Sequence, residues 1–133
     1  MEEQLHILLI EDDEGIAEVY RFRLALDGYL VTVAGDGEQG LQQAAAVSPD
    51  LIFLDLRLPN MSGIEVLRRL REDPATSAIP VVIVTNYDEP DLRSQGLSLG
   101  ALEFLVKADT IPAQLSEAAD RWTARDTADT SPN

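Results

Sequence analysis

Cysteine is absent from this chain of 133 residues, aromatic residues make up only 5%, and lysine occurs once, at position 107. Without cysteine the chain can form neither a disulfide nor a thiolate metal site. No apolar run approaches the roughly 18 residues that a membrane-spanning helix needs, and the acidic residues 1–4 do not resemble a secretory signal. We therefore expect one soluble, cytoplasmic domain with a short remainder.

Positive charge is also scarce, because 24 acidic residues stand against 10 basic ones and the formal charge is −14. Direct binding of nucleic acid relies on lysine and arginine to displace counterions, so this balance argues against it. We expect the partner to be another protein. Three arginines cluster at Arg68, Arg69 and Arg71, and we expect them to form a solvated helix face.

Short apolar runs alternate with amphipathic stretches of helical length. The predicted strands are residues 5–10, 30–34, 51–54, 81–85 and 102–106. The first, third and fourth runs are almost continuously apolar, which is typical of parallel strands that are covered on both faces. This alternation predicts an α/β fold, with a doubly wound parallel sheet and helices on both of its faces.

Helical spacing of apolar residues also predicts which side chains face the core. The third helix starts with the capping pattern Ser-Gly-Ile-Glu at residues 62–65, and the last helix starts near Thr110. The residues predicted to face inward are Ile16, Val19, Tyr20 and Leu24, then Leu41, Ala44 and Ala45, then Val66, Leu67 and Leu70, and finally Ile111, Leu115, Ala118, Ala119 and Trp122.

The stretch 91–99 is the weakest of the predicted helices. Only Leu92, Gly96 and Leu99 fall in helical register, and a glycine inside a helix costs about 1 kcal/mol relative to alanine. We expect this helix to be marginal and easily shifted. Residues 126–133 lack large apolar side chains, and we expect a disordered tail there.

Acidic residues follow two of the predicted strands: Glu11, Asp12 and Asp13 come after the first, and Asp55 comes after the third. In a parallel α/β sheet, ligands bind outside the carboxyl ends of the strands. If these two strands are neighbours, about 4.8 Å apart, the carboxylates crowd one small volume and repel one another unless a hard cation shares them. Mg²⁺ binds such oxygens together with waters and phosphate oxygens.

Each of these residues also has an ordinary structural use. Asp13 is well placed to cap the first helix, Thr85 alone is a good strand residue, and Lys107 alone is a solvated strand end. However, Thr85 closes the fourth strand and Lys107 follows the fifth, so both emerge at the same edge of the sheet as the carboxylates. A hydroxyl and an ammonium can bind phosphoryl oxygens, so the convergence predicts a Mg²⁺ site that is open to a phosphoryl group.

Four segments in matching order and spacing resemble the receiver domain family of two-component response regulators. They are residues 5–13 (LHILLIEDD), 55–63 (DLRLPNMSG), 82–85 (VIVT) and 100–107 (GALEFLVK). The resemblance implies a flavodoxin-like sheet of five parallel strands in the order 2-1-3-4-5 with five helices. It spans residues 5–125. We therefore expect a single-domain response regulator, with a receiver domain over residues 1–125 and the tail over residues 126–133.

The resemblance also implies a chemistry for the acidic residues. Asp55 is the nucleophile that takes a phosphoryl group from the phosphohistidine of a histidine kinase or a phosphotransfer protein, with Mg²⁺ as the cofactor. Asp12, Asp55 and the backbone carbonyl of Arg57 bind the cation directly, and Glu11 acts through water. Such a domain catalyses only its own phosphorylation and dephosphorylation, so we do not expect a turnover enzyme.

By the same resemblance, Lys107 and Thr85 bind phosphoryl oxygens, and Phe104 turns into the space that Thr85 vacates. The surface of the fourth helix, the fifth strand and the fifth helix then changes and signals to a downstream protein. The family more commonly has tyrosine at the position of Phe104. Because phenylalanine lacks the hydroxyl, we expect the switch to be blunted.

Two further positions depart from the family. Ala108 stands where a proline with a cis bond usually follows the lysine, and a cis bond before another residue costs about 2.5–4 kcal/mol. We therefore predict a trans bond and a rearranged loop. Asn86 stands where a small residue is usual, and we expect Asn86, Tyr87 and Arg57 to restrict attacking water and prolong the life of the acyl phosphate.

Two other functions stay open at this point. A receiver-like domain can bind a protein constitutively without phosphorylation, and Ala108 and Asn86 leave room for this function. A Mg²⁺-dependent phosphatase or phosphotransferase that forms an aspartyl phosphate often has a second acid two residues after the nucleophile, where this chain has Arg57. The complete set of site residues favours the phospho-acceptor.

Overall fold

The computed structural model describes residues 4–86 and 88–123. Along these residues strands and helices alternate from the first strand to the last helix. The strands are β1 (His6–Ile10), β2 (Leu30–Ala34), β3 (Leu51–Leu54), β4 (Val81–Thr85) and β5 (Glu103–Val106). The helices are α1 (Glu14–Leu26), α2 (Gly37–Val47), α3 (Gly63–Glu72), α4 (Pro90–Ser98), the 3₁₀ helix η1 (Lys107–Asp109) and α5 (Pro112–Trp122).

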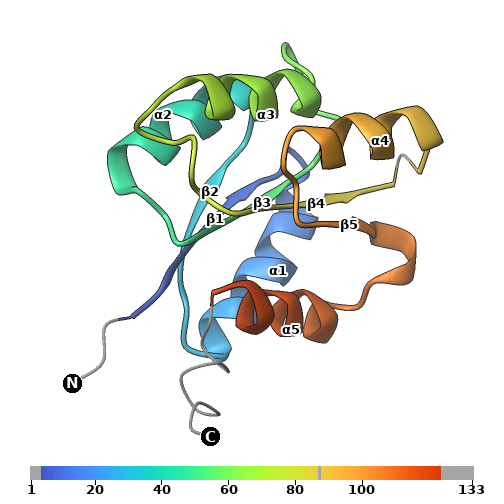
Figure 1. Cartoon of the computed structure of the whole chain (residues 1–133). Coiled ribbons are helices and arrows are strands. Elements are labelled where there is room, and N and C mark those ends of the chain that lie inside the picture. The colour runs from blue at the N-terminus through green and yellow to red at the C-terminus, as the bar shows by residue number, and fades with distance from the viewer. Residues whose placement is uncertain (1–3, 87, 124–133) are drawn as a thin grey trace, which may run out of the picture.

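The strands form one parallel sheet in the order β2-β1-β3-β4-β5. Helices α1 and α5 cover one face of this sheet, and α2, α3 and α4 cover the other (Figure 1). The chain crosses over β1 on its way from β2 to β3, so the strand order reverses between β1 and β3. The predicted fold class and strand order are confirmed, and the reversal marks the sheet edge where ligands bind in such folds.

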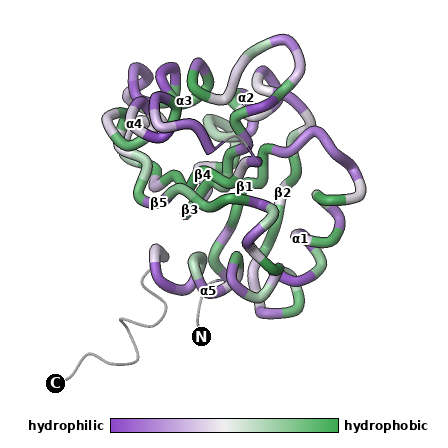
Figure 2. The backbone as a smooth tube through the Cα atoms, turned by 90° about the vertical axis from the view of Figure 1, so that its right-hand side faces the viewer, coloured by the Kyte–Doolittle hydropathy of each residue, from purple (hydrophilic) through white to green (hydrophobic). Residues whose placement is uncertain are grey.

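Each face of the sheet has its own hydrophobic core, because successive side chains of a strand point to opposite faces. In β1, Leu8 and Ile10 pack under α2, α3 and α4, whereas Ile7 and Leu9 pack against α1 and α5. Figure 2 shows the apolar strands in the centre of the molecule, between helices of mixed hydropathy. Burial on both faces is the reason that β1, β3 and β4 are almost continuously apolar.

The predicted strand boundaries agree with the structure to within one residue. The first predicted strand, residues 5–10, begins at His6, and the fifth, residues 102–106, begins at Glu103. The other three strands have the predicted bounds. Within the described residues no helix is long and apolar enough to cross a bilayer. The predicted tail at residues 126–133 lies outside the described residues.

Three of the side chains predicted to face inward are exposed instead. Ile111 is 62% exposed because α5 starts at Pro112, later than predicted, which leaves Ile111 in the capping position before the helix. Val19 is 53% exposed and lines a groove between α1 and the segment that leads into α5. Ala45 points to solvent from α2. Spacing alone therefore located the helices but overestimated the width of their buried faces.

The prediction of a solvated arginine face is wrong for one of the three residues. Arg68 and Arg69 are exposed and pair with Glu65 one turn earlier in α3. Arg71 is different, because its Nε donates to the carbonyl oxygen of Leu99 at 2.8 Å. Its other guanidinium nitrogens reach further carbonyls before β4 and after α4. Arg71 therefore ties the end of α3 to the end of α4.

Helix α4 is weakly held, as its sequence predicts. Its N-cap residue, Glu89, makes no side-chain capping hydrogen bond, and Gly96 is the only buried residue of the helix. A Cβ atom at Gly96 would lie 2.5 Å from the Cδ1 atom of Ile83, so the glycine permits close packing on β4. That α4 shifts during signalling stays a prediction.

Candidate functional site

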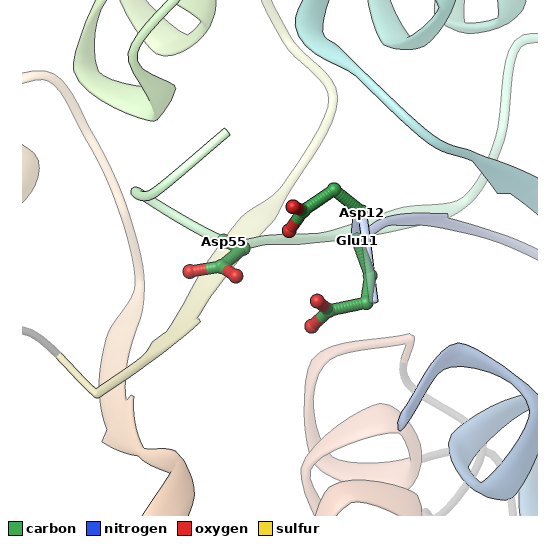
Figure 3. Close-up of side chains that lie close together, drawn as sticks. All are labelled: Glu11, Asp12 and Asp55. Atoms are coloured by element: carbon green, nitrogen blue, oxygen red, sulfur yellow. The ribbon is translucent and has the colours of Figure 1, made fainter. Parts of the chain in front are cut away.

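The three predicted carboxylates meet where β1 and β3 end side by side. Ile10 and Leu54 form the last pair of the two strands, so Glu11 and Asp55 are the next residues along neighbouring strands. One oxygen from each of Glu11, Asp12 and Asp55 lies within 4.8 Å of the others. Figure 3 shows these side chains gathered at the strand ends. The sheet register therefore assembles an acidic cluster from distant parts of the chain.

The members of this cluster differ in burial. Glu11 and Asp55 are 3% and 5% exposed, whereas Asp12 is exposed to solvent. Asp13 is not part of the cluster, because its side chain caps α1 by accepting a hydrogen bond from the backbone N–H of Ile16 at 3.0 Å. The simple structural interpretation of Asp13 is confirmed, and Asp12 is the carboxylate that faces the open side of the site.

Lys107 connects the two buried carboxylates. Its Nζ atom lies 2.6 Å from Oε1 of Glu11 and 2.8 Å from Oδ2 of Asp55, and its side chain is only 10% exposed. Lys107 directly follows Val106, which forms the last pair of β4 and β5 with Thr85. A buried charge needs a partner of opposite sign, so the only lysine of the chain holds together a site that would otherwise repel itself.

Burial and pairing act in opposite directions on these groups. Burial raises the pKa of Glu11, and this effect outweighs the hydrogen bonds donated by Lys107 and by the backbone N–H of Asp13. For Lys107, burial works to lower the pKa, but the hydrogen bonds to Asp55 and Glu11 outweigh it and raise the pKa above its ordinary value. The lysine therefore stays cationic at neutral pH.

The loop after Asp55 is fixed by backbone contacts. The backbone N–H of Arg57 donates to Oδ1 of Asp55 at 3.2 Å, and the N–H of Gly63 donates to the carbonyl of Leu56 at 2.9 Å. A Cβ atom at Gly63 would lie 2.3 Å from the carbonyl oxygen of Asp55. Gly63 therefore lets α3 start directly against the backbone of the site, which the spacing of the motif did not by itself reveal.

An open cavity of about 520 Å³ lies over the cluster. It is lined by Glu11, Asp12, Asp13, Ile16, Asp55, Arg57, Leu58, Pro59, Thr85, Asn86 and Lys107. These include every predicted site residue except Phe104. The cavity is therefore negatively charged at its floor, contains one ammonium group, and has room for a phosphoryl group together with a hydrated cation.

The two predicted switch residues lie on neighbouring strands, two positions apart in register, since Phe104 pairs with Ile83 and Thr85 pairs with Val106. Of the two, Thr85 lines the cavity. Thr85 is fully buried at the end of β4. Phe104 lies two residues before the end of β5 and is 7% exposed, so it already points inward. The guanidinium carbon of Arg93 in α4 lies 4.5 Å from the centre of the Phe104 ring, which is within the range of a cation–π contact.

Asn86 and Ala108 make a direct contact at the rim of the cavity. The backbone N–H of Ala108 donates to Oδ1 of Asn86 at 3.0 Å. The described residues contain no cis peptide bond, so the predicted trans bond between Lys107 and Ala108 is confirmed. Tyr87, which was predicted to crowd the site, lies outside the described residues.

Comparison with known proteins agrees with this arrangement. The sequence model of the family described as "Response regulator receiver domain" matches residues 7–119. This chain belongs to that family. It is therefore a receiver domain of two-component signalling, and such domains act in signalling rather than as ordinary enzymes.

Two individual relatives show how similar the sequences are. An uncharacterised transcriptional regulatory protein of Bacillus subtilis, YkoG, is 42% identical over 105 residues, which is 79% of this chain and 45% of that protein. The response regulator PleD of Caulobacter vibrioides is also 42% identical, over 76% of this chain and 22% of that protein. The receiver domain thus spans less than half the length of these curated relatives.

Solved structures show the same fold. A response regulator receiver domain protein (CheY-like) of Methanospirillum hungatei superposes with a TM-score of 0.87 at 24% identity, covering 96% of this chain and 99% of that one. A putative response regulator of Chloroflexus aurantiacus gives a TM-score of 0.84 at 29% identity, covering 92% of this chain and all (100%) of that one. The receiver fold is therefore established for this chain.

Proposed function

We propose that Asp55 accepts a phosphoryl group from the phosphohistidine of a histidine kinase or a phosphotransfer protein, with Mg²⁺ as the cofactor. The observation that carries this proposal is the position of the Lys107 ammonium, 2.6 Å from Glu11 and 2.8 Å from Asp55, beside the exposed carboxylate of Asp12. A nucleophile, a cation site and a cationic ligand for phosphoryl oxygens are thereby available at one opening.

The donor set suits a hard divalent cation. Asp12, Asp55 and the backbone carbonyl of Arg57 would hold Mg²⁺ directly, and Glu11 would act through water. All of these ligands are oxygens, and Mg²⁺ commonly keeps several waters beside one or two carboxylates. When bound, the cation neutralises charge on the phosphoryl oxygens and aligns the donor with the acceptor. Asp12 supports this assignment, because Lys107 pairs with Glu11 and Asp55. The negative charge of Asp12 therefore stays available for a cation.

The transfer itself exchanges one bond to phosphorus for another. An oxygen of the Asp55 carboxylate attacks phosphorus, the bond between phosphorus and the donor imidazole nitrogen breaks, and that nitrogen keeps the electron pair. In the second half of the cycle, water attacks phosphorus and the bond between phosphorus and the Asp55 oxygen breaks. The Asp55 carboxylate is regenerated, and inorganic phosphate is released together with the proton that the water gives up. The residues of the chain position these groups, which is the main contribution of a protein to phosphoryl transfer.

Lys107 and Thr85 supply the phosphoryl ligands in this proposal. The Lys107 ammonium now binds Oδ2 of Asp55, and after transfer it would bind a phosphoryl oxygen at nearly the same place. The Thr85 hydroxyl would donate to a second phosphoryl oxygen. Asn86 and Arg57 line the same cavity, and we expect them to restrict attacking water and so prolong the life of the acyl phosphate.

The signal would leave through α4, β5 and α5. Movement of Thr85 toward the phosphoryl group would change the packing around Phe104 and the contact of that ring with Arg93. The exposed side chain of Leu97 lies in α4, and that of Leu102 lies directly before β5. A change in helix position would alter the apolar surface that they offer. A downstream protein that binds this surface would detect phosphorylation.

We assign the receiver domain to residues 1–125.

The test is to incubate the protein with acetyl phosphate and Mg²⁺ and to record its intact mass. We expect a gain of about 80 Da, one phosphoryl group, that disappears when EDTA replaces Mg²⁺ and in the Asp55→Asn variant. A purified phosphohistidine donor is used in parallel, because some receivers take phosphate only from their protein donor. No mass gain with either donor would overturn the proposal and favour a constitutive binding module.

The cation site can be tested without phosphoryl transfer. A cation that binds only the folded state raises stability, by about 2.7 kcal/mol at a concentration of 100 times its dissociation constant. We expect MgCl₂ to raise the melting temperature of the wild type more than that of Asp12→Ala, at equal ionic strength. An equal rise in both proteins would remove Asp12 from the site.

A further inference from the structure

The turn that follows Lys107 is closed from two sides. On its far side, the backbone N–H of Thr110 donates to the carbonyl of Lys107 at 3.1 Å, and its hydroxyl donates to the carbonyl of Val106 at 2.8 Å. On its near side, the N–H of Ala108 donates to Oδ1 of Asn86 at 3.0 Å. The near-side bond is the only one of these that reaches across to the neighbouring strand end.

The Asn86 bond extends the contact between β4 and β5 beyond the end of the sheet. Thr85 and Val106 are the last paired residues of the two strands, and Asn86 and Ala108 come one and two residues later. A backbone N–H can only donate, so the partner atom must be the amide oxygen of Asn86 and not its nitrogen. In this hydrogen bond Ala108 is therefore the donor and Asn86 is the acceptor.

This contact depends on two residues together. A proline at position 108 would have no N–H to donate, and glycine or alanine at position 86 would have no side-chain oxygen to accept it. The trans bond at Lys107 and the hydrogen bond to Asn86 thus belong to one local arrangement. It lies one residue from a lysine whose ammonium must meet two buried carboxylates.

The geometry points to Asn86 as a positioning residue for phosphoryl transfer: it holds the turn at Ala108 and thereby keeps the Lys107 ammonium at the acidic site. The effect on transfer rate rests on the proposed function, whereas the effect on the position of Lys107 does not. Lysine has a flexible four-carbon stem, so its charge is placed accurately only if the backbone below it is fixed. Asn86 lines the same cavity but acts through the turn.

The position of Lys107 can be measured directly, because it is the only lysine of the chain. Protein labelled with ¹³C- and ¹⁵N-lysine gives one ε-methylene signal in an NMR spectrum, and no phosphodonor is needed. In Asn86→Ala we expect this signal to move toward that of free lysine. In uniformly ¹⁵N-labelled protein we expect the Ala108 amide to exchange faster, by up to about tenfold, as expected for the loss of one hydrogen bond. Asn86→Asp keeps an oxygen acceptor and should retain the protection of the Ala108 amide.

The second measurement is the rate of phosphate uptake from acetyl phosphate in a double-mutant cycle with Ala108→Pro. We expect Asn86→Ala to slow uptake about tenfold in the wild-type background, the rate equivalent of one hydrogen bond, and by less than twofold when proline has already removed the donor. Equal slowing in both backgrounds, or an unchanged lysine signal in Asn86→Ala, would overturn the inference. If Ala108→Pro does not fold, the lysine and amide signals still decide the matter.

Failure of the two proposals can be told apart. If Asp55 is not a phospho-acceptor, the wild type takes up no phosphate from either donor, yet the lysine signal still responds to Asn86→Ala. If Asn86 is not a positioning residue, the wild type takes up phosphate and the lysine signal is the same in both proteins.

Discussion

At the scale of single residues, the floor of the site consists of buried charges that are paired with one another. Glu11 and Asp55 each accept from the Lys107 ammonium and from one backbone N–H. Within residues 4–86 and 88–123, no buried side-chain nitrogen or oxygen lacks a hydrogen-bond partner. An unpaired buried charge is strongly destabilising. The resting site is therefore held together by contacts that a cation and a phosphoryl group would have to replace.

Gly63 offers a test of how tightly the backbone of the site is packed. We expect Gly63→Ala to lower the free energy of unfolding by about 1–3 kcal/mol or more, because its Cβ atom would overlap the backbone. The overlap is with the carbonyl oxygen of Asp55, at 2.3 Å. The measurement is urea unfolding followed by circular dichroism.

Gly35→Ala is the matched control, because a Cβ atom there would meet nothing within 4 Å. We expect this control to change the free energy of unfolding by no more than about 0.5 kcal/mol. Equal effects of the two substitutions would show that the loss of glycine, and not the contact with Asp55, is responsible.

At the scale of whole elements, the helices differ in how their ends are held. Asp13, Asp36 and Ser62 each cap the start of a helix with a side-chain hydrogen bond, in α1, α2 and α3. Helix α4 has no such cap at Glu89. Its far end is held by Arg71 from α3. One end of α4 is therefore anchored and the other is weakly held, which favours movement about the anchored end.

Replacing Arg71 tests this anchor. We expect Arg71→Met to lower the free energy of unfolding by about 1–3 kcal/mol, since hydrogen bonds from a charged group are stronger than neutral ones. We also expect the amides at the end of α4 to exchange faster, because the carbonyls of Leu99 and Gly100 lose their donor. The measurements are urea unfolding and hydrogen exchange.

The matched control is Arg68→Met, because Arg68 lies on the same helix and pairs only at the surface, with Glu65. We expect a change of no more than about 0.5 kcal/mol there and unchanged exchange in α4. Loss of protection in α4 in both variants would contradict the assignment of Arg71 as the specific tie.

At the scale of the whole molecule, negative charge dominates. The formal charge is −14, and net charge of one sign destabilises a compact state through self-repulsion. Most of the ion pairs in the described residues are exposed, such as those of Glu65, whereas the pairs of Lys107 are buried. Exposed pairs contribute little to stability, so they offset only a small part of the repulsion.

Salt should therefore stabilise the protein. We expect the melting temperature to rise when NaCl increases from about 20 to about 200 mM, because the screening length falls to about 10 Å or less in this range. Differential scanning calorimetry measures the melting temperature. The comparison is a series of samples in which an uncharged osmolyte replaces NaCl at equal osmolality. A falling melting temperature would mean that the surface ion pairs outweigh the net repulsion.

Much of this molecule follows from the order of residues along the chain. Strands β1, β3 and β4 are nearly continuously apolar because they are buried on both faces. Short apolar runs were enough to predict β2, β3 and β4 to the residue. The gathering of Glu11, Asp12 and Asp55 was also predictable, because these residues follow the ends of neighbouring strands. The roles of the site residues stay predictions. Membership of the receiver family is visible in the same segments.

Other features depend on how distant segments meet in space. Lys107 and Asp55 are 52 residues apart, and the chain order does not state which carboxylates the ammonium contacts. The sequence predicted Arg71 to be part of a solvated cluster, but in the structure Arg71 binds the carbonyl oxygen of Leu99 at the end of α4. Asn86 and Ala108 looked like separate departures from the family, yet they share one hydrogen bond. Periodicity reports which face of an element is buried, but hydrogen bonds depend on directions and distances that arise only when the elements pack.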